Sequence, residues 1–176
     1  MLPTLRDHEI VIAVGLNGNT LSYGDIVVFK KPPQNRDYWV KRVVGLPGDT
    51  VQIKDGTIYI NNTPIYRKQL TNYSEVDAER SRIIYKQYLE SFQNGRQYFS
   101  IDEDNGPLEI DNTSTYAVPR GQYFVIGDNR DNSIDSRLPI SGDGTGFIPA
   151  ENIGYIVRWV IRPLPKTVDG EAASLR

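Results

Sequence analysis

Hydrophobic positions in this chain of 176 residues occur in short runs separated by turn-forming residues. Such runs, rich in Val and Ile and bounded by Gly, Pro, Asn or Asp, are typical of β-strands rather than helices. The pattern predicts a mainly β fold. The strands are expected at residues 9–14, 26–29, 37–45, 122–126 and 153–161. The run at 26–29 is unbroken, which predicts a strand that is buried on both faces.

Turn chemistry predicts two hairpins. Residues 50–53 and 57–60 flank a short connection that contains Asp55 and Gly56, and residues 83–92 and 96–101 flank Asn94-Gly95. Asn-Gly favours the tight turns that join antiparallel strands. Residues 76–92 can also be drawn as a short amphipathic helix, but the Asn-Gly pair favours the hairpin. Between these hairpins and the first strands, Pro47-Gly48 has the residues of a type II turn.

The middle of the chain is more polar than its two ends, with no repeat and no low-complexity segment. This change predicts a core built from residues 1–60 and 116–162, interrupted by a β-rich insertion at 61–115. Residues 163–176 are expected to be a disordered tail, as chain ends without tertiary contacts usually are.

Composition narrows the chemistry that the chain can perform. A net charge of −2, without a cluster of Lys and Arg, argues against binding nucleic acid. The chain has no cysteine and a single histidine, His8. Thiolate catalysis, Cys-ligated zinc and a two-His metal site are therefore excluded, and His8 is poorly placed for a Ser-His-Asp triad. If the protein is a hydrolase, its general base is expected to be a lysine.

No apolar run reaches the ~20 residues that a membrane-spanning helix needs. The longest, residues 153–161, is interrupted by Arg158, and the N-terminus has no signal-peptide pattern. As given, the chain is not expected to cross a bilayer.

The segment from Gly127 to Arg137, GDNRDNSIDSR, is the first candidate for a site. It follows an apolar strand directly, and its charges alternate in sign, so they can pair with one another around two hydroxyl groups. A solvated loop is the simpler interpretation, because Asp, Asn and Ser favour turns. A calcium loop is excluded, since its sixth and twelfth positions would be Ser133 and Pro139 rather than Gly and Glu. The charged residues are Asp128, Arg130, Asp131, Asp135 and Arg137.

Lys41 is the second candidate. Alternation along the strand at 37–45 puts Trp39, Lys41 and Val43 on one face and Val40 and Arg42 on the other. An ordinary lysine on an edge strand is one interpretation. If Lys41 is buried among apolar neighbours, however, its pKa falls below ~10.4, as a catalytic base requires.

Four segments together resemble the successive motifs of bacterial type I signal peptidases, peptidase family S26. They are MLPTL at 1–5, GDIVVF at 24–29, KRVVGLPGD at 41–49 and GDNRDNSIDSR at 127–137, in the order of the family. GFIPAENI at 146–153 resembles the segment that follows them. The resemblance extends from residue 1 to about 159, with 61–115 as the variable insertion of the family.

This resemblance implies a serine protease with a Ser/Lys dyad on a mostly antiparallel, barrel-like β fold. Such enzymes use no cofactor or metal, are anchored in the bacterial cytoplasmic membrane, and remove signal peptides from exported preproteins on its outer face. It further implies that Lys41 is the general base and that Ser133 hydrogen-bonds its ammonium group. Asp135 and Arg137 would form an ion pair behind the base, with supporting charges from Asp128, Arg130 and Arg42.

The resemblance also suggests how substrate binds. A peptide would add as an extended strand between residues 1–5 and 38–41. Small residues, typically Ala, are expected at the first and third positions before the cut. The pockets that select them would be lined by Met1, Leu5, Val28, Trp39 and Val40.

The sequence departs from the family at its start. The family nucleophile is the serine directly before the Met of Ser-Met-x-Pro-Thr-Leu, and this chain begins at that Met. The upstream serine of the oxyanion hole and the membrane anchor are also not in it. We expect a truncated catalytic domain that is inactive as given. The alternatives are a non-catalytic module that binds extended peptides and, with a poorer match, a self-cleaving repressor domain.

Overall fold

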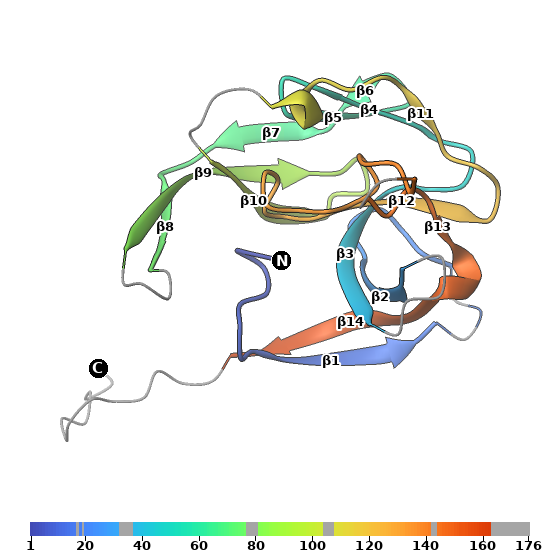
Figure 1. Cartoon of the computed structure of the whole chain (residues 1–176), viewed down its shortest axis with the longest axis horizontal. Helices are drawn as coiled ribbons and strands as arrows, with labels where there is room; N and C mark the ends of the chain where they lie inside the picture. The colour runs from blue at the N-terminus through green and yellow to red at the C-terminus, as the bar shows by residue number, and fades with distance from the viewer. Residues whose placement is uncertain are drawn as a thin grey trace.

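In the part of the chain that the structure describes, every pairing between two strands is antiparallel, and the strands form three sheets (Figure 1). The computed structural model describes residues 1–16, 18, 20–31, 37–76, 81–103, 108–141 and 144–162. The prediction of a mainly antiparallel β fold is confirmed. The predicted disordered tail, 163–176, lies outside the described residues.

The largest sheet has six strands in the order β1-β14-β2-β3-β12-β13. Its strands come from both ends of the sequence, so β14 lies between β1 and β2 along the lower edge of Figure 1. The bounds are β1 Ile10–Gly15, β2 Ile26–Lys30, β3 Tyr38–Gly45, β12 Gln122–Ile126, β13 Ile148–Pro149 and β14 Ile153–Ile161.

A second sheet has the order β11-β4-β5-β6 and lies at the top of Figure 1. The hairpin predicted at residues 50–60 forms the two central strands of this sheet, β4 and β5. Its turn residues Asp55 and Gly56 both have positive φ, as tight hairpin turns require. The turn before β4 is also as predicted: Gly48 has φ +94°, and the Asp49 N–H donates to the Leu46 carbonyl over 3.0 Å. The bounds are β4 Thr50–Lys54, β5 Thr57–Ile60, β6 Thr63–Pro64 and β11 Tyr116–Ala117.

The third sheet is built from the central part of the chain, and β9 pairs with three partners, β7, β8 and β10. The predicted hairpin at Asn94-Gly95 is confirmed, whereas the helical alternative is wrong for residues 82–91. The division into core and insertion stays a prediction. The bounds are β7 Tyr66–Gln69, β8 Tyr73–Val76, β9 Arg82–Ser91 and β10 Gln97–Glu103; two short 3₁₀ helices, η1 Glu109–Asp111 and η2 Ala150–Asn152, complete the described elements.

Two hydrophobic clusters pack against β3 and β12, one on each face of this strand pair. Val43 and Val125 belong to one cluster, whereas Val44 and Phe124 belong to the other. These strands are therefore buried on both faces near their contact. The same was expected of β2, and that prediction is wrong: Val27 and Phe29 are buried in one hydrophobic cluster, whereas Ile26 and Val28 on the other face are only half-buried.

The segment before β1, residues 1–9, has no regular structure and reaches into the space between β3 and the third sheet (Figure 1). We call this segment the lead-in. Among the described residues, no helix has the length and apolar character of a membrane span.

Candidate functional site

Lys41 lies in the middle of β3, opposite Val27 of β2. It shares a face with Trp39, whose ring centroid is 5.6 Å from Nζ. Burial lowers the pKa of Lys41 below its ordinary value, more than the nearby Asp135 carboxylate raises it. The side chain is thus poised to carry a neutral amine at a lower pH than an exposed lysine does.

Residues 127–137, predicted as a polar site, begin where β12 ends, next to the part of β3 that contains Lys41. Ile126 pairs with Arg42, so Gly127 starts a loop that runs next to Lys41. We call residues 127–137 the charged loop. The loop crosses itself tightly, because a Cβ placed on Gly127 would lie 2.1 Å from Ser133 Oγ. Only glycine at 127 allows Ser133 its position.

Ser133 Oγ is buried, and among the described residues it forms no hydrogen bond of ordinary geometry. It lies near the Asp135 carboxylate and helps to hold the pKa of Asp135 below its ordinary value. The hydrogen bond from Ser133 to Lys41, expected from the family resemblance, is not formed in this structure.

Asp135 and Arg137 form the ion pair that the resemblance implied. Arg137 Nε and Nη2 donate to the two carboxylate oxygens, each over 2.9 Å, and both side chains are buried. Burial alone would raise the pKa of Asp135, but Arg137 and the Gly127 N–H hold it below its ordinary value. Asp135 consequently remains a carboxylate behind Lys41.

Arg42 and Asp128 form a second buried pair, on the opposite face of β3 from Lys41. Arg42 Nε and Nη2 donate to Asp128 over 2.8 and 2.7 Å. Although burial opposes its charge, Asp128 raises the pKa of Arg42 above its ordinary value. Thr4 donates its hydroxyl to the same carboxylate, which ties the lead-in to the charged loop. Thr4 was not among the residues predicted from the sequence.

Arg130 has a partner that sequence reasoning missed. Its guanidinium donates to Glu90 of β9 and to the Tyr98 hydroxyl, the latter over 3.0 Å. Glu90 is fully buried, and Arg67 Nε lies 3.2 Å from its other oxygen. Nothing in the sequence singled out Glu90, because it is one of several polar residues in β9, RIIYKQYLES.

The expectation that the loop charges pair with one another is therefore right for Asp135 and Arg137 alone. Asp128 and Arg130 pair with β3 and β9, and Asp131 accepts the backbone N–H of Glu103 over 2.7 Å. Apart from the Asp135–Arg137 pair, these charges bind the loop to β3 of the first sheet and to β9 and β10 of the third.

The lead-in brings Met1 to this site. Its amino group is largely buried, and burial together with the charge of Lys41 lowers the pKa of that group. Two charges affect each other in this way only when they are close. The Met1 amino group therefore lies within electrostatic range of Lys41, and Leu5 folds back to donate its N–H to the Met1 carbonyl over 2.9 Å.

The residues expected to contact substrate do not all share one face. Val28 lies opposite Val40 in the β2–β3 pair, so these two side chains form one apolar patch. Trp39 points to the other face, with Lys41. All three are half-buried, so parts of each remain open to a ligand.

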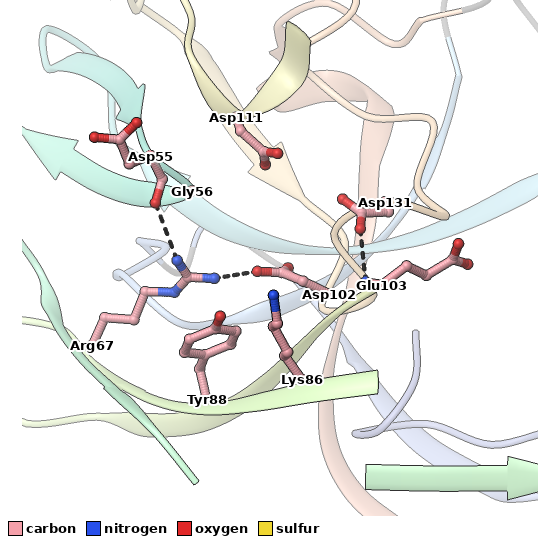
Figure 2. A pocket seen from close by; sticks show the side chains of 9 residues that line it. All are labelled: Asp55, Gly56, Arg67, Lys86, Tyr88, Asp102, Glu103, Asp111 and Asp131. Carbon is pink, nitrogen blue, oxygen red and sulfur yellow. Dashed lines mark hydrogen bonds and ion pairs between the residues drawn. The ribbon is translucent and has the colours of Figure 1, made fainter. Parts of the chain in front are cut away.

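A separate cavity of about 240 Å³ lies between the β4–β5 turn and the third sheet (Figure 2). Arg67 crosses it, donating to Asp102 and to the Asp55 carbonyl, and its guanidinium carbon lies 3.6 Å from the Tyr88 ring centroid. Burial raises the pKa of Asp102 despite this partner. The cavity is a structural junction, and among the described residues no group of three or more His, Asp or Glu side chains is arranged to hold a metal ion.

Comparison with known proteins agrees with the motifs. A model of the family described as "Signal peptidase, peptidase S26" matches residues 1–161. The chain is 42% identical over 134 residues to signal peptidase I of Rickettsia prowazekii (strain Madrid E), an alignment that covers 73% of this chain. It is 40% identical over 136 residues to the corresponding protein of Rickettsia akari (strain Hartford).

The chain spans about half the length of the curated relatives it matches, 47% for the R. prowazekii protein. A crystal structure of a signal peptidase I from Enterococcus faecalis V583 is also similar, with a TM-score of 0.45 and 26% identity, over 80% of this chain and 98% of that one. The family match covers nearly the whole described chain, including Lys41 and the charged loop. This chain therefore belongs to the signal peptidase family, peptidase S26.

Proposed function

We propose that this chain is the catalytic part of a serine protease of the signal peptidase I type, which removes signal peptides from exported preproteins. The observation that carries the proposal is the position of Lys41, a lysine in the middle of β3 next to the start of the charged loop, whose pKa is lowered by burial. A residue joined to Met1 in a longer protein would be attached at a nitrogen that lies within electrostatic range of this amine.

The nucleophile in this proposal is a serine immediately before Met1 in the full-length protein. The neutral Lys41 amine takes the hydroxyl proton as the serine oxygen attacks the scissile carbonyl carbon. The resulting ammonium then protonates the departing amine, which leaves an acyl-enzyme. Water, deprotonated by Lys41 in turn, hydrolyses the ester and regenerates the serine.

The charged loop would support this chemistry. Ser133 has a buried hydroxyl near Asp135, the carboxylate that acts on Lys41, so we assign it the role of accepting a hydrogen bond from the Lys41 ammonium once that ion forms. Asp135 and Arg137 keep the loop in place behind the base, and a charged Asp135 stabilises the ammonium that appears during the reaction. Arg42, Asp128 and Arg130 fix the loop to the strands around it.

The substrate would bind as an extended strand between the lead-in and β3. Met1, Leu5, Val28, Trp39 and Val40 would line the pockets, and their bulk would leave room only for small residues at the first and third positions before the cut. The full-length protein would hold this domain at the outer face of the bacterial cytoplasmic membrane through an N-terminal anchor.

The test uses the full-length protein and a synthetic signal-peptide substrate. We expect cleavage by the full-length protein, loss of cleavage when the serine before Met1 is changed to alanine, and no cleavage by the 176-residue chain alone. If the short chain cleaves as fast as the full-length protein, the nucleophile lies elsewhere. If no version cleaves but the peptide binds, the protein is a peptide-binding module instead.

A further inference from the structure

The carboxylate of Asp128 joins three parts of the proposed catalytic site. It belongs to the charged loop, and it accepts hydrogen bonds from Nε and Nη2 of Arg42 on β3, over 2.8 and 2.7 Å. The hydroxyl group of Thr4, in the lead-in, donates to the same carboxylate. Arg42 Nη2 also donates to Thr4 Oγ1 over 3.3 Å. One side-chain hydroxyl of the lead-in is therefore held by both members of a buried ion pair.

Thr4 attaches the start of the lead-in to the rest of the molecule. Among the described residues, it is the only member of the segment 1–5 that forms a hydrogen bond or an ion pair outside the lead-in. The N–H of Leu5 donates to the Met1 carbonyl, which is a contact within the segment. Pro3 is buried, so packing keeps the segment against the site, whereas the directional contacts that fix its position are those of the Thr4 hydroxyl.

The ion pair that holds Thr4 is itself supported from the third sheet. Tyr98 of β10 packs its ring against Arg42, whose guanidinium carbon lies 4.1 Å from the ring centroid. The Ile101 N–H, also from β10, donates to the backbone carbonyl of Asp128 over 2.9 Å. Both partners of Thr4 are thus held by neighbouring strands, and a charge-assisted hydrogen bond to such a carboxylate is a strong one.

The place of Thr4 in the sequence links this attachment to the reacting groups. Met1 is three residues before Thr4, and its amino group lies within electrostatic range of Lys41. In the proposed protease, the nucleophilic serine is joined to that nitrogen. Arg42, which holds Thr4, is the neighbour of Lys41 in β3. The distance between nucleophile and base therefore depends on a contact between the lead-in and the residue next to the base.

We propose that Thr4 is a positioning residue of the cleavage reaction. Its hydroxyl fixes the lead-in to Asp128 and Arg42, and so places the serine before Met1 where the Lys41 amine can take its proton. Because the hydroxyl is engaged by the ion pair, it acts on the chemical step rather than on substrate binding. This inference rests on the proposed protease function.

The first experiment compares Thr4→Val and Thr4→Ser in the full-length protein, with a synthetic signal peptide as substrate. Valine has nearly the shape of threonine but no hydroxyl, whereas serine keeps the donor and the acceptor. We expect Thr4→Val to lower kcat by a factor of about 10–100 with KM unchanged, the loss that a small misplacement of reacting groups gives. Thr4→Ser should retain most of the wild-type kcat.

Thr50→Val is the matched control. It also removes a threonine hydroxyl, but Thr50 lies in β4 of the second sheet, and its contact with Asn61 Oδ1 is 3.4 Å long and exposed. We expect wild-type kcat and KM. A loss of kcat as large as that in Thr4→Val would show that any such exchange disturbs the enzyme, and would overturn the assignment of Thr4.

A second comparison tests whether Thr4 acts through Asp128. Asp128→Asn removes the carboxylate that receives both donors. In that background Thr4→Val should lower kcat by a much smaller factor than in the wild-type protein, because residues of one hydrogen-bond network have non-additive effects. Equal factors in the two backgrounds overturn the inference. Circular dichroism checks the fold of each variant, and Thr4→Ala measures the same loss if the valine variant does not fold.

The outcomes separate the two proposals. Failure of the wild-type protein to cleave any peptide refutes the protease function and this inference with it. Cleavage by the wild-type protein with an unchanged kcat in Thr4→Val overturns this inference alone, as does an equal loss of kcat in Thr4→Ser and Thr4→Val or a loss that appears only as a higher KM.

Discussion

The two faces of β3 place neighbouring cations in opposite environments. Arg42 is buried against Asp128, which raises the pKa of the guanidinium, and it receives further contacts from the Gly24 carbonyl and the Tyr98 ring. Lys41 has no carboxylate ion-paired to it among the described residues, and burial lowers its pKa. One face uses a charge to hold the fold, whereas the other keeps an amine ready to lose its proton.

The difference shows how the same burial can serve two purposes. A buried cation with a bidentate carboxylate partner stays charged and rigid. A partly buried cation that is not ion-paired, and whose neighbouring carboxylate Asp135 is paired with Arg137, is instead destabilised in its charged form. The substitutions described next alter either the amine that must lose its proton or the buried contacts that hold the charged loop in place.

The largest effect is expected at Lys41. In the full-length protein, Lys41→Ala removes the base, and Lys41→Arg replaces it with a group that stays protonated. Each substitution should therefore lower kcat/KM by a factor of ~10²–10⁴ or more. Cleavage assays measure the loss, and circular dichroism checks that the fold remains. Substantial activity in the arginine variant would contradict the Ser/Lys assignment.

The next largest effect is expected on the free energy of unfolding, when the buried ion pair between Glu90 and Arg130 is broken. Glu90→Gln removes the charge that neutralises Arg130 in a fully buried position, and breaking such a pair typically costs about 3–5 kcal/mol of unfolding free energy. Urea denaturation measures it. Arg162→Ala is the matched control, because the Arg162–Glu9 pair has an exposed partner and should cost about 0–1 kcal/mol. Equal losses in both variants would show that Glu90 is not part of a buried network.

A smaller effect is expected where the charged loop crosses itself. Gly127→Ala forces Ser133 away from its position, and such overpacking usually costs about 1–3 kcal/mol. We expect lower stability and, in the full-length protein, lower kcat. Gly154→Ala is the control, because the nearest atom to its added Cβ, the Val28 carbonyl oxygen, is 3.9 Å away. If Gly127→Ala leaves the activity unchanged, the position of Ser133 is not important for catalysis.

Local features of the fold were predictable from the sequence, because they depend on neighbouring residues. The hairpins at Asp55-Gly56 and Asn94-Gly95 follow from turn chemistry. The ion pair between Asp135 and Arg137 joins two residues of the same loop that are two positions apart. The burial of β2 on both faces was predicted wrongly, since its sequence cannot reveal whether a second layer covers it.

The remaining contacts of the site depend on tertiary structure. Arg42 and Asp128 are 86 positions apart, and Arg130 and Glu90 are 40 apart. Nothing in the composition of the charged loop distinguishes pairing within it from pairing to β3 and β9. The cavity of about 730 Å³ beside the lead-in is likewise invisible in the sequence, because its lining comes from residues 1–8, from β8 and β9 and from the charged loop.

The most direct test of the account is the titration of Lys41 itself. Its amine must be neutral to act as a base, so a lower pKa provides more base at a given pH and moves the rise of kcat/KM to lower pH. The measurement is an NMR titration of ¹³C-labelled lysine side chains, with Lys41→Met to assign the resonance. We expect a midpoint for Lys41 below the reference value of ~10.4. A midpoint at or above that value would contradict the claim that this face of β3 prepares a catalytic base.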